Sequence, residues 1–252
     1  MDPRVALLRE FYRGLPKDRA KLETRAHGFA YLDRLLADGM ELEYGELTLS
    51  GVLHKYKLRR IPERRMDELL HAHVAQTCNV CLYFGEPAND LFCFNLDNNE
   101  RDGGGAANPE TERAVRILTE KLGALGCEPL VVASGRGYHL WGRLGGAVAN
   151  ERLYDFMLRA AVVTAAELHR EGSDHHRVKF NFYPDPRTRD VVSLRLFGSV
   201  HARNGVFSRV LAPDGLRDEA GSWEFFSAYL GRTIPLPAFE SACRALREAT
   251  PA

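Results

Sequence analysis

The sequence lacks any long apolar run. No stretch approaches the roughly 20 consecutive apolar residues that are needed to span a bilayer. The opening residues, from Met1 to Arg4, also lack the apolar stretch of a signal peptide. We therefore expect a cytoplasmic protein with no membrane partner.

The chain also lacks an excess of either charge, with 34 Lys plus Arg against 34 Asp plus Glu. Its net charge therefore gives no argument for a nucleic-acid partner. Between positions 55 and 65, however, basic residues gather around the single acid Glu63. Such a patch suits a phosphate backbone, and it equally suits a solvated strand edge and helix start, so both interpretations stay open. Its basic members are Lys55, Lys57, Arg59, Arg60, Arg64 and Arg65.

Cysteine is scarce and odd in number, with 5 residues in a chain of 252. This argues against a disulfide framework, and we expect reduced thiols. A His-x-His-x4-Cys-x2-Cys run, formed by His71, His73, Cys78 and Cys81, offers four ligands that zinc accepts. Residues 79–84, however, have the pattern of a buried strand, on which Cys78 and Cys81 would point to opposite faces. A structural strand is therefore the stronger interpretation, with zinc as the alternative.

No internal repeat, low-complexity tract or Pro- or Ser-rich linker interrupts the chain. Its hydrophobic content of 45% and charged content of 27% are those of an ordinary globular protein. We expect one compact unit with three parts. These are an N-terminal α/β module over 1–90, a second module over 91–211, and C-terminal helices over 212–252 that pack on the core.

The N-terminal third mixes helical and strand patterns. Apolar spacing in the first forty residues predicts two amphipathic helices, over Val5 to Phe11 and Phe29 to Leu36, broken near Gly14 to Pro16. Residues 42–56 alternate around Ser50 and Gly51, which indicates a hairpin. Pro62 then begins a helix that runs to about Val74.

The rest of the chain predicts an α+β fold. Apolar runs at 78–84 and 91–96 indicate two adjacent strands, and Gly103 to Gly105 mark a flexible loop. Asn108 is a plausible N-cap for a helix that begins at Pro109. From residue 91 to 196 the elements follow a β-α-β-β-α-β order, which is that of a ferredoxin-like or RNA-recognition-motif sheet. Further strands are expected at 129–133, 138–142, 178–183, 191–196 and 206–211, and helices at 109–122, 151–169, 223–230 and 237–248.

Three segments hold polar residues that suit a nucleoside triphosphate. Asp97 falls at the end of a predicted strand, after Phe94, Asn95 and Leu96. Divalent ions held by such carboxylates neutralise phosphates and align the attacking hydroxyl, and two or three acids are needed. Asp185 and Asp190 are the candidates for the second acid.

The other two segments add hydrogen-bond donors and positive charge. In the turn from Ser134 to His139, glycines let the backbone approach a phosphate, while Ser134 and Arg136 donate to it. The third segment runs from Arg195 to Gly205 and is basic and hydroxyl-bearing. Taken singly, a Gly-x-Gly turn is most often a hairpin, and a histidine on a strand is most often structural.

In this order the segments resemble the three motifs of the archaeo-eukaryotic primase superfamily. Residues 94–97 are similar to its first motif, in which Asp-x-Asp or Asp-x-Glu follows hydrophobic residues. Residues 134–139 are similar to its Ser-Gly-x-Gly-x-His turn, and residues 185–205 to its third motif, an acid followed by an Arg-Leu-Pro-Gly-Ser-Leu-His-like segment. The resemblance covers roughly residues 91–211.

The resemblance implies a fold and a site. The fold would be a primase-type catalytic module, similar to an RNA-recognition motif, packed against the N-terminal module. Catalysis would rest on Asp97, Asp185 and His139, with Mg²⁺ or Mn²⁺ held by Asn95, Asp97, and Asp185 or Asp190. The nucleotide would be held by Ser134, Arg136, Gly137, His139, Arg195, Ser199, His201 and Arg203. The partners would be nucleoside triphosphates, a single-stranded or primed DNA or RNA template, and a helicase or another replication or repair protein.

The sequence departs from the family pattern at two positions. Asn95 stands where the first acid is expected, which removes one negative charge from the metal site. Phe197 stands where the family usually has proline. An intrinsic Asn95 and an engineered change from Asp would read alike here.

Three functions follow as alternatives. The first is a template-dependent nucleotidyltransferase of the primase-polymerase type. The second is a catalytically degenerate relative that binds nucleotide or nucleic acid without turnover, which Asn95 favours. The third is an RNA-binding sheet that stacks bases on exposed aromatic residues, for which Phe92, Phe94, Tyr138 and Trp141 are the candidates.

Overall fold

The chain is seen in a computed structural model that describes residues 2–16, 18–25, 41–47, 53–85, 87–99, 107–188, 193–201 and 204–250. Several predicted features lie outside these residues. They are the second N-terminal helix over Phe29 to Leu36, the turn at Ser50 and Gly51, the loop with Gly103 to Gly105, and the site residues Asp190 and Arg203.

The chain forms two compact units. The first comprises Met1–Glu86 and Thr188–Ser208, and the second comprises Pro87–Arg187 and Arg209–Ala252. These divisions differ from the predicted ones at 90 and 211. The difference has a clear cause, because the strand β9 (Ser193–Arg195) pairs with β4 (Asn79–Tyr83) and so belongs to the first unit.

The first unit is a five-stranded antiparallel sheet with helices on one face. Its strand order is β2-β3-β1-β4-β9. The predicted hairpin is present, since β2 and β3 pair antiparallel, and the predicted helix after Pro62 is α3. The bounds are α1 Pro3–Phe11, β1 Ala20–Arg25, β2 Glu41–Leu47, β3 Leu53–Arg59 and α3 Glu63–Val74.

Two expectations about this unit are wrong. Ala20–Arg25 is the strand β1, in a stretch where the sequence predicted only helices and a break. In addition, β4 and β5 (Ala88–Asn98) are not neighbours, because β4 belongs to the five-stranded sheet and β5 to a separate six-stranded one. The strand β4 instead lies between β1 and β9.

The second unit has the predicted β-α-β-β-α-β order of elements, and its sheet has the strand order β11-β10-β6-β7-β5-β8. The fold is therefore α+β. Its finer likeness to a primase-type RNA-recognition-motif module stays a prediction. The bounds are α4 Pro109–Ala124, β6 Leu130–Ala133, β7 Gly137–Ala149, α5 Asn150–Arg170, β8 Val178–Tyr183, β10 Arg209–Ala212, β11 Gly215–Leu216, α6 Glu219–Tyr229 and α7 Leu236–Ala249, with short 3₁₀ turns η1 (His175–Arg177) and η2 (Pro186–Thr188).

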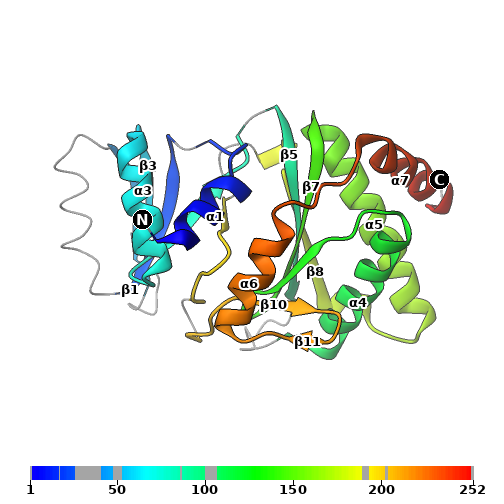
Figure 1. Ribbon diagram of the computed structural model, residues 1–252. Coiled ribbons are helices and arrows are strands. Elements are labelled where there is room, and N and C mark those ends of the chain that lie inside the picture. Colours follow the sequence, from blue (N-terminus) through cyan, green and yellow to red (C-terminus); the bar gives the residue numbers. More distant parts are fainter. Residues whose placement is uncertain are drawn as a thin grey trace. The chain divides into compact units, whose positions relative to one another are not determined.

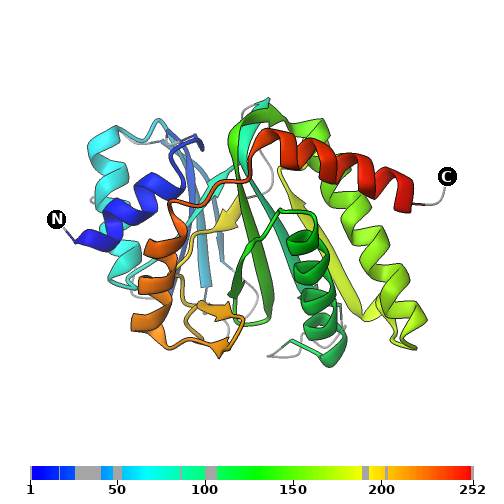
Figure 2. The same cartoon turned by 45° about the vertical axis from the view of Figure 1, so that its right-hand side comes forward.

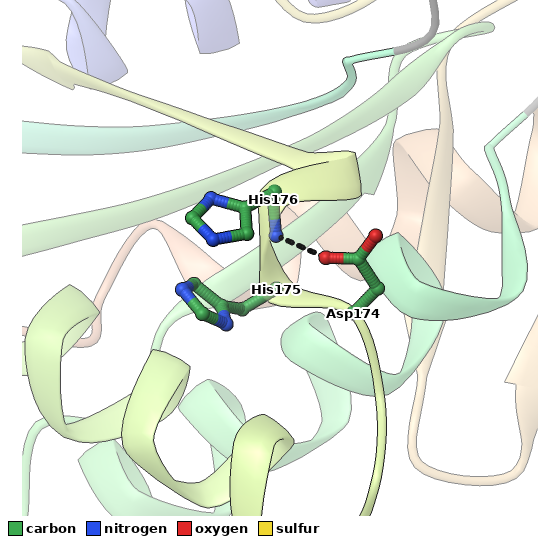
Figure 3. Close-up of side chains that lie close together, drawn as sticks. All are labelled: Asp174, His175 and His176. Carbon is green, nitrogen blue, oxygen red and sulfur yellow. Dashed lines mark hydrogen bonds between the residues drawn. The ribbon is translucent and has the colours of Figure 1, made fainter.

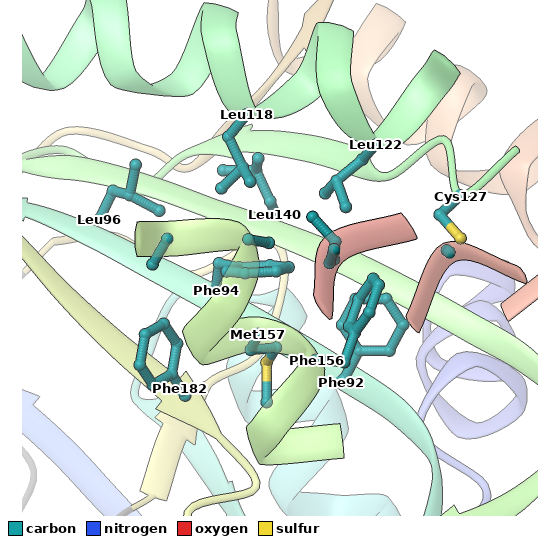
Figure 4. Close-up of a cluster of buried hydrophobic side chains, with 14 of the residues drawn as sticks. Phe92, Phe94, Leu96, Leu118, Leu122, Cys127, Leu140, Phe156, Met157 and Phe182 are labelled. Carbon is teal, nitrogen blue, oxygen red and sulfur yellow. The ribbon is translucent and has the colours of Figure 1, made fainter. Parts of the chain in front are cut away.

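Helices α4, α5 and α7 cover one face of the six-stranded sheet (Figures 1 and 2). Alternate residues of β5, namely Phe92, Phe94 and Leu96, enter the core beneath them, and Phe94 packs edge-on against Phe156 of α5. Figure 4 shows these rings among the leucines of α4. Because side chains alternate along a strand, the residues between them point to the opposite face. We call that opposite side the open face, a name that refers only to its place away from these helices, since Cys93, Asn95 and His139 on it are buried.

The start of α4 is capped as predicted. Asn108 Oδ1 accepts a hydrogen bond of 2.7 Å from Thr111 N. Its Nδ2 donates to Asn98 Oδ1 at 3.2 Å and to the Arg177 carbonyl at 3.1 Å, so one side chain joins α4, β5 and the turn before β8. Within the described ranges, no helix combines the length and apolar content that crossing a bilayer requires.

Candidate functional site

The open face of the second unit carries a row of polar side chains. In the strand register, Asn95 on β5 stands directly opposite His139 on β7 and directly opposite Asn181 on β8. Directly paired residues of antiparallel strands project from the same face of the sheet. Three strands thus bring an imidazole and two amides side by side.

A second row lies next to the first, toward the end of β5. Here Asp97 is paired with Gly137 on one side and with Lys179 on the other. The Ser134 amide donates to the Gly137 carbonyl at 2.8 Å, which closes the turn beside this row. The first and second predicted motifs are therefore neighbours in the sheet. Lys179 lies in the same row, on the other side of Asp97.

The carboxylate of Asp97 faces hydrogen-bond donors. Asn95 Nδ2 donates to Asp97 Oδ2 at 3.2 Å, and Arg136 Nη2 lies 3.8 Å from the same oxygen. An aspartate in place of Asn95 would instead set two carboxylates against each other, which a cation would have to balance. The hydrogen bond from Asn95 therefore stabilises the negative charge of Asp97 without a metal ion.

Asn95 also presents an acceptor that nothing in the described chain uses. The residue is only 8% exposed, and its Oδ1 has no hydrogen-bond partner among the described residues. A buried acceptor of this kind loses its hydrogen bonds to water, so it favours a ligand that can donate one. This oxygen is the strongest sign of a ligand on the open face.

The backbone conformation and packing of the turn explain why the second motif has glycine at both Gly135 and Gly137. Gly135 has φ of +98°, which side chains rarely adopt. At Gly137 an added Cβ would lie 1.9 Å from the Leu96 carbonyl oxygen, because β7 passes very close to β5 there. The turn therefore fixes where Arg136 stands, and Ser134 and His139 are buried beside it at 4% and 5% exposure.

Asp185 does not lie beside Asp97, contrary to the expectation. The register sets Tyr183 opposite Cys93, about 13 Å along β5 from Asp97 at the usual rise per residue, and Asp185 follows beyond it. Its Oδ1 accepts from the Arg187 amide at 2.9 Å, and its Oδ2 lies 2.9 Å from Arg187 Nη2. The hydrogen bonds from Arg187 hold the pKa of Asp185 below its usual range.

The partner of Asp185 points to the helix-covered side of the sheet. The Arg187 guanidinium stands 4.6 Å from the centre of the Tyr154 ring on α5, and that ring packs on Phe182 of the core. At the level of Asn95, the register of β8 places Asn181 on the open face, so the residue at this position is an amide and not an acid.

The part of the third motif from Arg195 to Gly205 lies in the first unit and is held by its backbone. His73 Nε2 meets the Phe197 carbonyl at 2.8 Å, and the Tyr12 hydroxyl accepts from the Phe197 amide at 3.0 Å. Asn79 Nδ2 and Oδ1 pair with the carbonyl and amide of Val200. Phe197, which replaces the proline of the family pattern, is thus a core residue.

Within this segment, the side chain of Arg195 pairs with an acid of the same unit. Arg195 Nη1 lies 3.5 Å from Glu23 Oε2, and Lys21 Nζ lies 3.2 Å from Glu23 Oε1. Ser199 and His201 are buried, at 3% and 7% exposure. That these residues line one pocket with Asp97 and His139 stays a prediction.

The predicted zinc ligands do not come together. His71 is exposed, whereas His73 is buried and uses both ring nitrogens, since Nδ1 accepts from Val80 N at 3.1 Å and Nε2 pairs with Phe197. Burial raises the pKa of the Cys78 and Cys81 thiols to about 12, so both stay protonated. Within the described chain these four residues form no metal-binding group.

The predicted basic patch of the first unit is partly neutralised. Arg60 pairs with Glu41 at 2.7 Å, Arg65 pairs with Glu68, and Lys57 lies 5.9 Å from the centre of the Tyr83 ring. Arg59 and Arg64 are exposed, and the side chain of Lys55 lies outside the described part of the structure. Nucleic-acid binding by this patch stays a prediction.

Among its described residues, the open face does not fit the Mg²⁺ or Mn²⁺ that the resemblance implies. Mg²⁺ and Mn²⁺ favour carboxylate and other charged oxygen ligands. In the two described rows, Asp97 is the only carboxylate, with Arg136 Nη2 at 3.8 Å and the exposed Lys179 as its register partner on β8. The charges therefore suit an anion better than a cluster of cations.

The four aromatic residues that were candidates for base stacking pack inside the protein. Phe92 and Phe94 are fully buried under the helices, Trp141 is 1% exposed, and Tyr138 packs against the same core. These four residues are structural, so they give no support to an RNA-binding sheet.

Comparison with known proteins gives a likeness among solved structures and none among family models or curated sequences. No family model matches the chain, and no curated protein matches its sequence. Among solved structures, the polymerase domain of ligase D from Mycobacterium tuberculosis, in complex with DNA, is similar with a TM-score of 0.48 and 16% identity, covering 98% of this chain and 88% of that chain. This score is too low for the chemistry of that protein to be transferred.

Proposed function

We propose that the open face of the second unit binds the polyphosphate of a nucleotide, in a protein of the primase-polymerase type that has lost most or all of its nucleotidyl transfer. The observation that carries this proposal is the row of Asn95, His139 and Asn181 beside Asp97. Asn95 on β5 and Asn181 on β8 are neutral amides, whereas metal-dependent transfer needs carboxylates.

The charges of the site support binding of an anion. One carboxylate, Asp97, faces the two cations Arg136 and Lys179, which gives these three residues a net charge of +1. Phosphate oxygens accept strong hydrogen bonds from guanidinium and ammonium groups. A polyphosphate that approaches the open face would therefore meet cations without needing a metal to neutralise it.

The amides of Asn95, which is buried, and Asn181, which is partly exposed, support recognition of a hydroxyl or amine on the same ligand. The free Oδ1 of Asn95 accepts a hydrogen bond, and Asn181 offers both a donor and an acceptor. A ribose hydroxyl or a base amine supplies the donor that Asn95 lacks. The rigid strands that hold these groups keep them in place before the ligand arrives.

The sharpest test of the site asks whether nucleotide binding requires a divalent metal. We expect nucleoside triphosphate to bind in the presence of a chelator with an affinity within about threefold of that in Mn²⁺, because Arg136 and Lys179 are part of the protein. Isothermal titration calorimetry with and without chelator measures this directly. Binding that vanishes on chelation would contradict the proposed site.

Two variants locate the site and one controls for them. Arg136→Ala and Lys179→Ala each remove a charged donor to phosphate, which contributes about 1.5–3 kcal/mol, and should weaken binding by about tenfold or more. Lys121→Ala is the matched control, because Lys121 pairs with Glu167 on the helix-covered side. Equal affinities in all three variants would place the nucleotide elsewhere.

Transfer is tested by restoring the missing acids. We expect the wild-type chain to extend a primed template little or not at all with Mn²⁺, and the double variant Asn95→Asp, Asn181→Asp to extend it measurably. Asp has almost the same shape as Asn, so the change alters charge more than packing. Fast extension by the wild-type chain, unaffected by either change, would instead support an active polymerase.

A further inference from the structure

A group of metal-ligating side chains lies outside the open face, on the turn that precedes β8. Asp174, His175 and His176 each offer a ligand atom, and these atoms all lie within 4.8 Å of one another. Figure 3 shows the two imidazole rings stacked on the same side of the turn. Their centres are 4.0 Å apart, with an angle of 37° between the ring planes.

The turn is held in shape by its own carboxylate. Asp174 is the N-cap of η1, and its Oδ1 accepts from the His176 amide at 3.0 Å. The second oxygen of the carboxylate remains for a ligand. The turn therefore orders both the acid and the backbone that carries the two histidines.

Neighbouring segments fix the backbone of this turn. Asn99 Nδ2 donates to the His176 carbonyl at 2.9 Å, and the Asn99 amide donates to the Arg177 carbonyl at 2.9 Å. Asn108, the cap of α4, also donates to the Arg177 carbonyl. The backbone that carries the ligands is therefore fixed by hydrogen bonds from Asn99, just after β5, and from Asn108, the cap of α4.

A fourth ligand stands close by. His169, near the end of α5, is exposed, and its ring centre lies 6.1 Å from that of His175. A rotation of exposed side chains can therefore complete a set of three imidazoles and one carboxylate. Such a set matches the four-coordinate sites of zinc.

We propose that Asp174, His175 and His176, with His169 as a fourth ligand, form a site for a borderline transition-metal ion, with Zn²⁺ as the best match. Imidazole ligands select Zn²⁺, Cu²⁺ or Ni²⁺ over Mg²⁺, which prefers oxygen. The site is separate from the residues of the open face and does not depend on the proposed nucleotide binding. Lys179 and Asn181 follow the turn directly on β8, so a bound metal would also fix the start of that strand.

The test is a calorimetric titration of the whole chain with zinc chloride. We expect saturable binding of about one ion per chain that a large excess of Mg²⁺ does not displace. His175→Ala and His176→Ala should each weaken the affinity by at least tenfold, since changes even to residues that only support metal ligands cost about 10–100-fold. His71→Ala, at an exposed histidine of α3, is the matched control and should leave the affinity unchanged.

A second variant guards against misfolding. Asp174→Asn removes the negative charge and keeps a residue that caps a turn equally well, so the fold should be retained while zinc binds more weakly. Far-ultraviolet circular dichroism of each variant checks the fold before titration. Absence of saturable zinc binding in the wild-type chain, or equal affinity in the wild type and all three site variants, would overturn the proposal.

Discussion

Acid should destabilise the first unit through one buried histidine, His73. Its ring is fully buried, Nδ1 accepts from Val80 N, and Nε2 donates to the Phe197 carbonyl. Burial lowers the pKa of His73 from 6.5 to about 4. The folded protein therefore keeps the ring neutral under conditions in which the unfolded chain already binds a proton.

The sign and size follow from the linkage between proton binding and folding. The unfolded state binds more protons between pH 6.5 and about 4, so the free energy of unfolding falls as the pH drops through that window. The full difference in pKa corresponds to about 3 kcal/mol, at 1.36 kcal/mol per unit. Above the window His73 contributes no pH dependence.

Urea unfolding at several pH values measures this effect. Far-ultraviolet circular dichroism is the suitable signal, because both tryptophans, Trp141 and Trp223, lie in the second unit and their fluorescence does not report on His73. In His73→Asn, the amide oxygen can still accept from Val80 N but cannot titrate. We expect the stability advantage of the wild type over this variant to shrink by about 2–3 kcal/mol between pH 7.5 and pH 4.5.

The matched control is His71→Asn, which removes an exposed imidazole from the same helix. A difference between the wild type and His73→Asn that stays constant over the whole range would refute the reasoning. It would mean that His73 accepts a proton in the folded state at no cost.

Three further predictions concern the frame of the site. Gly137→Ala should lower the free energy of unfolding of the second unit by about 3 kcal/mol or more, because the new methyl would meet the Leu96 carbonyl. Tryptophan fluorescence during urea unfolding measures this loss, and a loss of less than about 1 kcal/mol would contradict the prediction. Asn108→Ala should cost at least about 1 kcal/mol by the same assay, because α4 loses its cap, whereas Asn108→Asp should retain most of that stability. The buried thiols of Cys78 and Cys81, whose pKa is raised to about 12, should react with a thiol reagent only as the protein unfolds, so labelling as fast as in urea would argue against the described burial.

Much of the second unit could be predicted from the sequence because its elements have strong local signals. Asn108 and Pro109 mark the start of α4, and the alternation of Phe92, Phe94 and Leu96 marks the buried face of β5. The same alternation places Asn95 and Asp97 together on the other face. The polar character of that face is therefore a property of a few consecutive residues.

The strand β1 could not be predicted because the charged residue Glu23 occupies a buried position and so interrupts the apolar–polar alternation of a strand. Glu23 is buried at 6% exposure, where an apolar residue or an exposed one would have revealed the alternation. Lys21 and Arg195 neutralise it, and Arg195 comes from a strand 172 positions away. Local periodicity contains no information about such a partner.

The site residues Asn181 and Lys179 were missed for a related reason. In the sequence, Asp185 best matches the acid of the third motif, but the pairing of β8 with β5 decides which residues stand beside Asp97. A shift of one residue in that register would turn Asn181 to the other face. Its signal in the sequence is only the alternation of Val178, Phe180 and Phe182, which points Lys179 and Asn181 outward together.

The central claim is that the open face binds nucleotide with the protein's own cations. The most direct measurement compares the affinity for nucleoside triphosphate in chelator and in Mn²⁺, for the wild-type chain and for Asn95→Asp, Asn181→Asp. We predict nearly equal affinities for the wild type, and binding at least tenfold tighter in Mn²⁺ for the double variant, because restored carboxylates repel phosphate unless a metal joins them. A wild-type chain that binds only with Mn²⁺, or a double variant that is indifferent to it, would contradict the claim.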